Sequence, residues 1–299
     1  MSAATDTAVD RIEAAFAAIG LHGRLHARDL DTAREVAVGA DEPVVLSSVF
    51  KVALVTAMYR RHEAGELDVA QQVDVPEAAR SAGATGLAAM EDAARLSLRD
   101  LAYLAIAVSD NAAADVLFDA VGDAAVTTLL GDLGLTATRI PQRCRDMTDA
   151  LVTDTGAAGL DDVRTRLRLD PRLLAALSVR DPARTNASTA REMTALLAAI
   201  WQDRAAAPGS CAAVRRLMRL QVWPHRLASG FPDEGWAVAG KTGTLPGIRN
   251  EIGVVEHADG SRVAVAVFTS ADSPAASLPQ ADRVVGTAAR IAVDALRAA

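Results

Sequence analysis

Ser47-Ser48-Val49-Phe50-Lys51-Val52-Ala53-Leu54-Val55 is an apolar run that carries two adjacent hydroxyls and one amine. The run continues to Glu63 without glycine or proline, so it predicts a largely buried helix. Ser48 and Lys51 are three residues apart and therefore share one face of its first turn. Serine becomes a nucleophile when a base accepts its proton, and a lysine with a lowered pKa is such a base. The N–H groups at a helix N-terminus also suit a developing oxyanion. The structural alternative is that Ser48 only caps the helix and Lys51 is solvated.

Lysine is scarce in this chain. Of the 31 basic residues, 29 are arginine and two are lysine, at Lys51 and Lys241. Arginine stays protonated in proteins, whereas lysine can lose its proton. Both lysines are therefore candidates for chemistry.

Two further short motifs combine polar side chains with apolar flanks. Ser109-Asp110-Asn111 follows the apolar run 101–108 and precedes a helical stretch, so Ser-Asp also fits an ordinary helix N-cap. Lys241-Thr242-Gly243-Thr244 follows the strand-like run 236–239, where a strand aligns N–H groups and hydroxyls beside a ligand. An exposed strand end with a solvated lysine is the alternative for the second motif.

Residues 235–242 also match the phosphate-loop pattern G-x-x-x-x-G-K-[ST]. That pattern binds nucleotide phosphates when a strand precedes it and a helix follows it. Here a loop precedes it, and Gly243, Pro246 and Gly247 prevent a helix after it. We therefore do not expect nucleotide binding.

Strand-like runs lie near both ends of the chain, and helical patterns fill the middle. Helices are predicted over 5–20, through most of 86–220 and over 281–297, and strands over 21–28, 34–38, 236–239, 252–256 and 262–269. We expect an α/β (α+β) fold in which both termini build one sheet flanked by helices, with an all-α domain inserted between them. The expected sheet domain comprises residues 1–45 and 225–299, the helical domain comprises residues 46–224, and the site lies at their interface.

Composition excludes several classes of protein. The chain has 299 residues, 51% hydrophobic and 23% charged, and a net charge of −7. A phosphate backbone is therefore not an expected partner, and no apolar run is long enough for a membrane span. Cys144 and Cys211 have no metal-ligand spacing and are expected to be reduced, so no metal and no cofactor is predicted. The first twenty residues lack the basic start and apolar run of a secretory signal, which favours a cytoplasmic location unless a signal has been removed.

The three motifs occur in a set order. S-x-x-K, S-D-N 61 residues later and K-T-G after a further 132 residues are together typical of penicillin-recognising serine enzymes. The chain resembles the class A β-lactamases and, more broadly, the penicillin-binding proteins, over most of its length. Residues 138–140 resemble the start of that family's Ω loop. Residues 250–254 resemble its strand after K-T-G, and residues 230–236 resemble its G-x-P-x-x-W run with one extra residue.

The resemblance implies a role for each motif residue. Ser48 would be acylated, Lys51 would accept its proton, and Ser109 would pass a proton to the leaving nitrogen. Asn111 would hold Lys51 and the side-chain amide of the substrate. The remaining implied residues bind a small-molecule substrate, a β-lactam or a related amide or ester: Lys241, Thr242, Gly243 and Thr244, with the N–H groups of Ser48 and Thr244 as an oxyanion hole. Arg226 and Arg249 lie near places where the family carries an arginine for the substrate carboxylate, and for each a surface role is the alternative.

One element of the family pattern is missing. Class A enzymes hydrolyse their acyl-enzyme with water activated by a glutamate in E-P-x-x-N, and Cys144 stands at that position here. No glutamate occurs between Glu91 and Glu192, so a shift in alignment does not restore it. Five nearby acids are candidate replacements, each with a surface charge as the alternative: Asp146, Asp149, Asp154, Asp161 and Asp162.

Three functions are consistent with this pattern. The first is a β-lactamase-like hydrolase with altered deacylation, as in antibiotic resistance or β-lactam catabolism. The second is a related esterase, amidase or acyltransferase of a biosynthetic pathway. The third is a penicillin-binding sensor that is acylated and barely turns over. The fold alone does not choose among them, because function depends on the site.

Overall fold

The computed structural model describes residues 3–275 and 277–298, so residues 1–2, 276 and 299 of the expected sheet domain lie outside the described part. Five antiparallel strands form the main sheet in the order β2-β1-β9-β8-β7. Their bounds are β1 Leu21–Asp29, β2 Glu35–Val38, β7 Trp236–Leu245, β8 Ile248–His257 and β9 Arg262–Ala271. The N-terminal strand β1 pairs along its whole length with β9, from Leu21 opposite Ala271 to Asp29 opposite Val263. The two ends of the chain therefore build one sheet, as expected.

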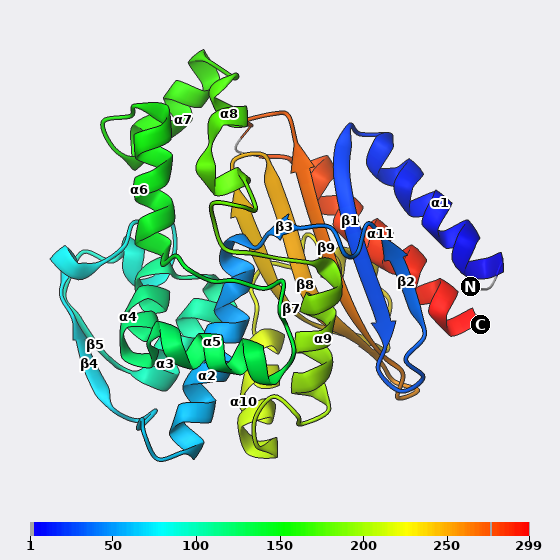
Figure 1. The fold of residues 1–299 in the computed structure, drawn as a ribbon, viewed down its shortest axis with the longest axis horizontal. Helices are drawn as coiled ribbons and strands as arrows, with labels where there is room; N and C mark the ends of the chain where they lie inside the picture. The colour runs from blue at the N-terminus through cyan, green and yellow to red at the C-terminus, as the bar shows by residue number, and fades with distance from the viewer. Residues whose placement is uncertain (1–2, 276, 299) are drawn as a thin grey trace.

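Helices cover both faces of this sheet. Figure 1 shows α1 (Ala3–Ala17) and α11 (Pro279–Ala298) together on one face, and the helical region on the other. Strand β9 is apolar on both sides, because Val263, Val265 and Val267 join the core under α11 while Ala264 and Ala266 join the larger core of the helical region. A strand buried on both faces reads as a continuous apolar run, which residues 263–268 are.

The helical region surrounds one long buried helix, α2 (Lys51–Glu63), which follows a 3₁₀ turn at Ser47–Phe50. The other helices are α3 Leu98–Tyr103, a π-helical turn Leu104–Val108, α4 Asn111–Val121, α5 Asp123–Asp132, α6 Cys144–Thr155, α7 Leu160–Leu169, α8 Leu173–Ala176, α9 Ala190–Trp201 and α10 Pro208–Arg219. Further 3₁₀ turns are Glu77–Ala79, Gly86–Ala89, Ser178–Arg180 and Leu227–Gly230. Two short antiparallel pairs also occur in this part of the chain: β4 Gln72–Val75 with β5 Ala94–Ser97, and β3 Val44–Val45 with β6 Ala187–Ser188. The fold is the expected α/β fold with a helical insertion, although the strands β4, β5 and β6 mean that residues 46–224 are not entirely α-helical as expected.

The strands β7 and β8 are longer than the sequence pattern predicts. The predicted strand 236–239 continues through the K-T-G motif to Leu245, and residues 248–251 extend the next strand. Glycine weakens a strand pattern, so the sequence predicts that the strand ends before Gly240. In the structure Gly240 marks a close approach, because a Cβ there would lie 2.4 Å from Glu251 Oε1. All of the phosphate-loop pattern except Gly235 thus lies within β7, and another strand, β8, follows it instead of a helix.

None of the helices in the described residues combines the length and the apolar character that a bilayer crossing requires. Cys144 and Cys211 are both free thiols and both buried, as expected.

Candidate active site

Ser48 and Lys51 lie at the start of α2. Ser48 is in the 3₁₀ turn that leads into the helix, is half-buried and faces a cleft of about 910 Å³. The preceding residue, Ser47, has a φ of 51°, a left-handed conformation that is uncommon for a residue with a side chain. Ser47 Oγ holds this turn by donating a hydrogen bond to the carbonyl of Thr244 on β7 at 3.0 Å. The turn therefore presents Ser48 to the cleft at the junction of sheet and helices.

The amine of Lys51 is fully buried and has three acceptors. Its Nζ lies 2.8 Å from the carbonyl oxygen of Ser109, 3.2 Å from that of Asp110 and 2.9 Å from Asn111 Oδ1. Three acceptors use all three N–H donors of a charged ammonium group. The S-D-N motif therefore forms a cage around Lys51.

A break between two helices determines the backbone conformation of the S-D-N motif. The π-helical turn ends at Ser109, whose φ of 65° is left-handed, and Asp110 caps α4 by accepting the N–H of Ala113 at 3.2 Å. The second carboxylate oxygen of Asp110 accepts the N–H of Leu87 at 2.6 Å. Asp110 is thus the helix cap that the sequence predicts, while the left-handed Ser109 is free to turn its hydroxyl toward the other lysine.

Lys241 reaches the same serine from the sheet side. Its Nζ donates to Ser109 Oγ at 2.8 Å and to the carbonyl of Thr242 at 2.8 Å. Complete burial, followed by repulsion from Lys51, holds the pKa of Lys241 well below its usual range, while Glu251 opposes this shift. The two lysines of the chain, 190 residues apart in sequence, therefore meet at Ser109.

Glu251 is a buried carboxyl group behind the K-T-G strand. Burial raises the pKa of its carboxyl group. Its oxygens accept the side-chain amide of Gln221 at 2.6 Å and the N–H of Leu227 at 2.7 Å, and Gln221 in turn accepts the N–H of Thr242 at 2.7 Å. This relay fixes the edge of β7 where Thr242 lies.

Gly243 has a steric role. A Cβ at this position would lie 2.7 Å from the carbonyl oxygen of Leu46 and 3.2 Å from the Cβ of Ser47. Strand β7 can therefore pass the turn that holds Ser48 only because residue 243 has no side chain. Thr244, next along β7, is exposed and lines the cleft.

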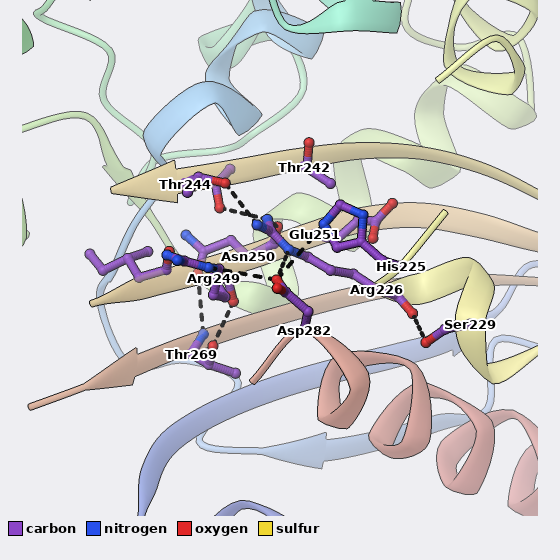
Figure 2. Close-up of polar contacts among 12 residues, drawn as sticks. His225, Arg226, Ser229, Thr242, Thr244, Arg249, Asn250, Glu251, Thr269 and Asp282 are labelled. Carbon is purple, nitrogen blue, oxygen red and sulfur yellow. Dashed lines mark hydrogen bonds and ion pairs between the residues drawn. The ribbon is translucent and has the colours of Figure 1, made fainter. Parts of the chain in front are cut away.

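Arg226 and Arg249 are both buried, with 4% of each exposed, and both lie beside Thr244 (Figure 2). Arg226 donates to Thr244 Oγ1 at 2.8 Å and to the carbonyls of Gly243 and Asn250. Arg249 borders the cleft and donates to the carbonyls of Leu245 and Ile248. A surface role is therefore wrong for both residues.

One carboxylate faces both guanidinium groups. Asp282, from helix α11 on the far face of the sheet, lies 2.7 Å from Arg226 Nε and 3.6 Å from Arg249 Nε. Burial and the neighbouring Arg226 lower the pKa of Arg249. Two guanidinium groups beside one carboxylate leave an excess positive charge near Thr244, which favours an anionic group of a ligand there.

Cys144 is the first residue of α6 and lines the cleft. Burial raises the pKa of its thiol to about 12, so the thiol is neutral at pH 7. The start of α6 is held by the buried Asp115, which accepts the N–H of Cys144 at 2.7 Å and that of Arg145 at 2.9 Å, and also the hydroxyl of Ser81. Three donors fix the Asp115 carboxylate as a helix clamp.

Of the five acids considered as replacements for the missing glutamate, Asp161 is the one that borders the cleft. Asp146 accepts the N–H of Arg143, Asp154 accepts the N–H and hydroxyl of Ser178, and Asp162 pairs with Arg166. Asp149 is exposed on α6 and does not border the cleft. The extra length that the sequence shows in this segment forms α6, α7 and α8 (Figure 1), and residues of α6 and α7 line the cleft.

The structure brings together Ser48, Lys51, Ser109, Asn111, Lys241 and Thr244, as the motifs predict. Sequence reasoning missed Asp115, Gln221, Glu251 and Asp282. The sequence contained an indication for Glu251, because this glutamate stands inside an apolar strand pattern. A glutamate at such a position is rarely fully buried unless its carboxyl group has partners. Asp282 and Gln221 resemble ordinary surface residues in the sequence, so nothing indicated their contacts.

Comparisons with known proteins agree with this geometry. The sequence model described as "Beta-lactamase enzyme family" matches residues 7–296. The chain is 34% identical over 297 residues to the β-lactamase regulatory protein BlaB of Streptomyces cacaoi, covering 93% of this chain and 94% of that protein. It is 28% identical over 277 residues to a β-lactamase of Amycolatopsis lactamdurans, covering 91% and 80% respectively.

Solved structures show the same fold at lower identity. A β-lactamase from Sphaerobacter thermophilus is similar with a TM-score of 0.79 and 24% identity, covering 98% of this chain and 97% of that one. PBP-A, in a variant described as an acyl-enzyme complex with penicillin G, is similar with a TM-score of 0.78 and 19% identity, with the same coverage. These two likenesses establish the expected β-lactamase/transpeptidase-like fold, and the family match extends over nearly the whole chain. The chain therefore belongs to the β-lactamase enzyme family.

Proposed function

We propose that this protein forms an acyl-enzyme at Ser48 with a β-lactam or a similar carboxylate-bearing amide or ester, and releases it slowly. The observation that carries the proposal is the convergence of two buried lysines on Ser109, one of them, Lys51, only three residues after Ser48 at the cleft. A surface serine and two solvated lysines would not occupy such positions.

The proposed acylation moves three protons. Ser48 Oγ attacks the substrate carbonyl carbon and passes its proton to Lys51, which must first be in its neutral amine form. The C–N or C–O bond breaks, and the leaving atom takes a proton from the Ser109 hydroxyl. Ser109 Oγ already accepts a hydrogen bond from Lys241 Nζ, so Lys241 gives Ser109 a proton in return and the hydroxyl is restored. The N–H groups of Ser48 and Thr244 stabilise the oxyanion.

The substrate carboxylate is proposed to bind at Lys241, Thr242 and Thr244. Arg226 orients the Thr244 hydroxyl and adds charge from behind the strand. Arg249 borders the cleft and adds charge from its side. Gly243 keeps the strand close enough to Ser48 for both ends of the substrate to be held together.

Slow release follows from the residue at the start of α6. A neutral, buried thiol at Cys144 does not activate water as a carboxylate does. General-base catalysis contributes about 10²–10⁴-fold, so the acyl-enzyme is expected to accumulate. This expectation favours a second role, a β-lactam sensor, since a relative 34% identical to this chain is described as a regulatory protein.

The test combines turnover with intact-protein mass. The protein is mixed with a chromogenic cephalosporin, and both hydrolysis and covalent adduct are followed. One adduct with a burst and slow turnover supports the proposal, and an adduct without turnover supports the sensor role. Ser48→Ala must abolish the adduct, while the matched control Thr165→Ala, which removes another hydroxyl that lines the cleft, must still be labelled. Labelling that survives Ser48→Ala refutes the proposal, and neither adduct nor turnover favours the related esterase, amidase or acyltransferase.

A further inference from the structure

We infer that the cleft selects substrates whose acyl side chain is an apolar arm ending in an anionic group, and that Arg164 and Arg168 on α7 recognise this anion. The inference rests on the proposed function, since the same site would bind the reactive amide or ester. It goes beyond it by naming the substrate class and the residues that select it.

The cleft is larger than the reactive centre requires. Its volume of about 910 Å³ is near the upper end of the range of about 300–1,000 Å³ that is usual for ligand sites. It extends from Ser48 past Asn111 and Cys144 to α6 and α7. A substrate that fills it therefore has a substantial group on the α6–α7 side of the reacting carbonyl.

The inner wall of this extension is apolar. Met147 and Leu151 of α6 and Val163 and Leu167 of α7 line it, and all four are buried. Burial of apolar surface is the main contribution that such a wall makes to binding. The part of the substrate next to the reactive group is therefore expected to be hydrocarbon-rich.

The outer rim carries two arginines on one helix face. Arg164 and Arg168 are four residues apart on α7, so their side chains leave the same side of the helix, and both line the cleft and are exposed. Within residues 3–275 and 277–298, no ion pair or side-chain hydrogen bond joins either guanidinium group to another residue. Arg166, on the same helix, pairs with Asp162 at 3.0 Å and does not line the cleft.

One acid also lies on this rim. Asp161, at the first turn of α7, is exposed and borders the cleft three residues before Arg164. Two arginines against one aspartate leave a net positive rim, and the buried Arg249 adds a further positive charge to the cleft wall. The unpaired charge at the far end of an apolar channel thus favours an arm with a terminal anion, such as a carboxylate.

The experiment uses pairs of penicillin-type β-lactams that differ only at the end of the acyl chain, one with a carboxylate and one with a primary carboxamide, in several chain lengths. Second-order rates of Ser48 acylation are measured by intact mass. The same pairs of compounds are titrated into the Ser48→Ala protein by calorimetry. This measures the difference in binding affinity between carboxylate and carboxamide without any covalent step. Each exposed charge pair contributes a factor of about two to five in affinity. We therefore expect the carboxylate compound to exceed the carboxamide in rate and affinity by roughly tenfold at its best chain length.

The variants locate the preference. Arg164→Gln and Arg168→Gln should each reduce the ratio several-fold and together abolish it, whereas the matched control Arg166→Gln should leave it unchanged. Equal rates and affinities for the two compounds at every length, or an equal loss in Arg166→Gln, overturn the inference. If neither compound labels Ser48 but Ser48→Ala still binds the carboxylate better, the proposed function fails and the selective rim stands.

Discussion

The double substitution Cys144→Glu, Asp115→Asn should shorten the lifetime of the acyl-enzyme. Cys144 begins α6 at the cleft, where a longer acidic side chain would face the acyl group on Ser48. The second change is needed because the Asp115 carboxylate is buried beside the same backbone and would repel the new charge. Asparagine keeps one oxygen to accept an N–H of the α6 start, so the helix keeps part of its clamp.

The size of the effect follows from the state of the thiol. With a pKa of about 12, a thiol at pH 7 is ionised in about one molecule in 10⁵, so Cys144 supplies essentially no base. A well-placed base is worth about 10²–10⁴-fold. Position 144 is buried, which restricts the access of water to a carboxylate there, so we expect an effect at or below the lower end of this range, about 10- to 100-fold faster deacylation.

The assay is stopped-flow turnover with mass-spectrometric quench. Wild-type protein should show a burst of one equivalent followed by slow release, and the Asp115→Asn, Cys144→Glu protein should show a faster steady state. Asp115→Asn, Cys144→Gln is the matched control, because it has the same size and no base. Fast linear turnover by the wild type would falsify the reasoning, since another group would then activate water; Asp161 is the first to test. An equal gain in the glutamine control would show that looser packing, not a base, had caused the change.

Three further outcomes are expected. Lys51→Arg should reduce acylation by about 10²–10⁴-fold because arginine does not accept a proton, whereas Lys241→Arg should weaken substrate affinity more than the acylation rate at saturation; equal losses in rate would contradict these roles. Because the folded protein lowers the pKa of Lys241, its charge is lost at lower pH than that of a free lysine; apparent affinity for an anionic substrate should therefore fall as pH rises through that lowered pKa, and a profile that is flat up to the ordinary lysine pKa contradicts this. Asp115→Ala should leave two backbone N–H groups of α6 without their acceptor, which costs about 2–6 kcal/mol, and calorimetry should show a Tm lower by about 3–10 °C, against a small change for the exposed Asp119→Ala.

The sequence was most informative where a residue type was rare or a motif was ordered. Two lysines among 31 basic residues pointed to Lys51 and Lys241 before any contact was known, and the structure buries both at one serine. Strand-like runs near the two ends of the chain predicted the sheet, because a continuous apolar run such as 263–268 is typical of a strand that is buried on both faces. The glycines made the predicted strand 236–239 too short. Gly240 and Gly243 lie inside β7, where the missing side chain leaves room for Glu251 Oε1 and for the carbonyl oxygen of Leu46.

What the sequence did not reveal depends on partners distant along the chain. The extra segment after Cys144 has helical periodicity, but nothing in it indicates that α6 and α7 stand over the cleft. Arg226 and Arg249 were two among 29 arginines, and their burial depends on Asp282 from the last helix. Such contacts are set by the packing of the whole fold, which local pattern does not encode.

The pairing of β1 with β9 has a consequence for how the protein is made. Leu21 lies opposite Ala271, so the first long strand has its partner only after about 250 more residues have been synthesised. At ribosomal speeds of roughly 5–20 residues per second, that interval is about 12–50 s. During this time β1 is paired at most with the short β2, and its open edge is exposed to other nascent chains. Lys241 and the other β7 residues of the site are also made late. Nascent-chain folding should therefore be slow and sensitive to crowding on polysomes, and the site should assemble only when the C-terminal third of the chain has left the exit tunnel.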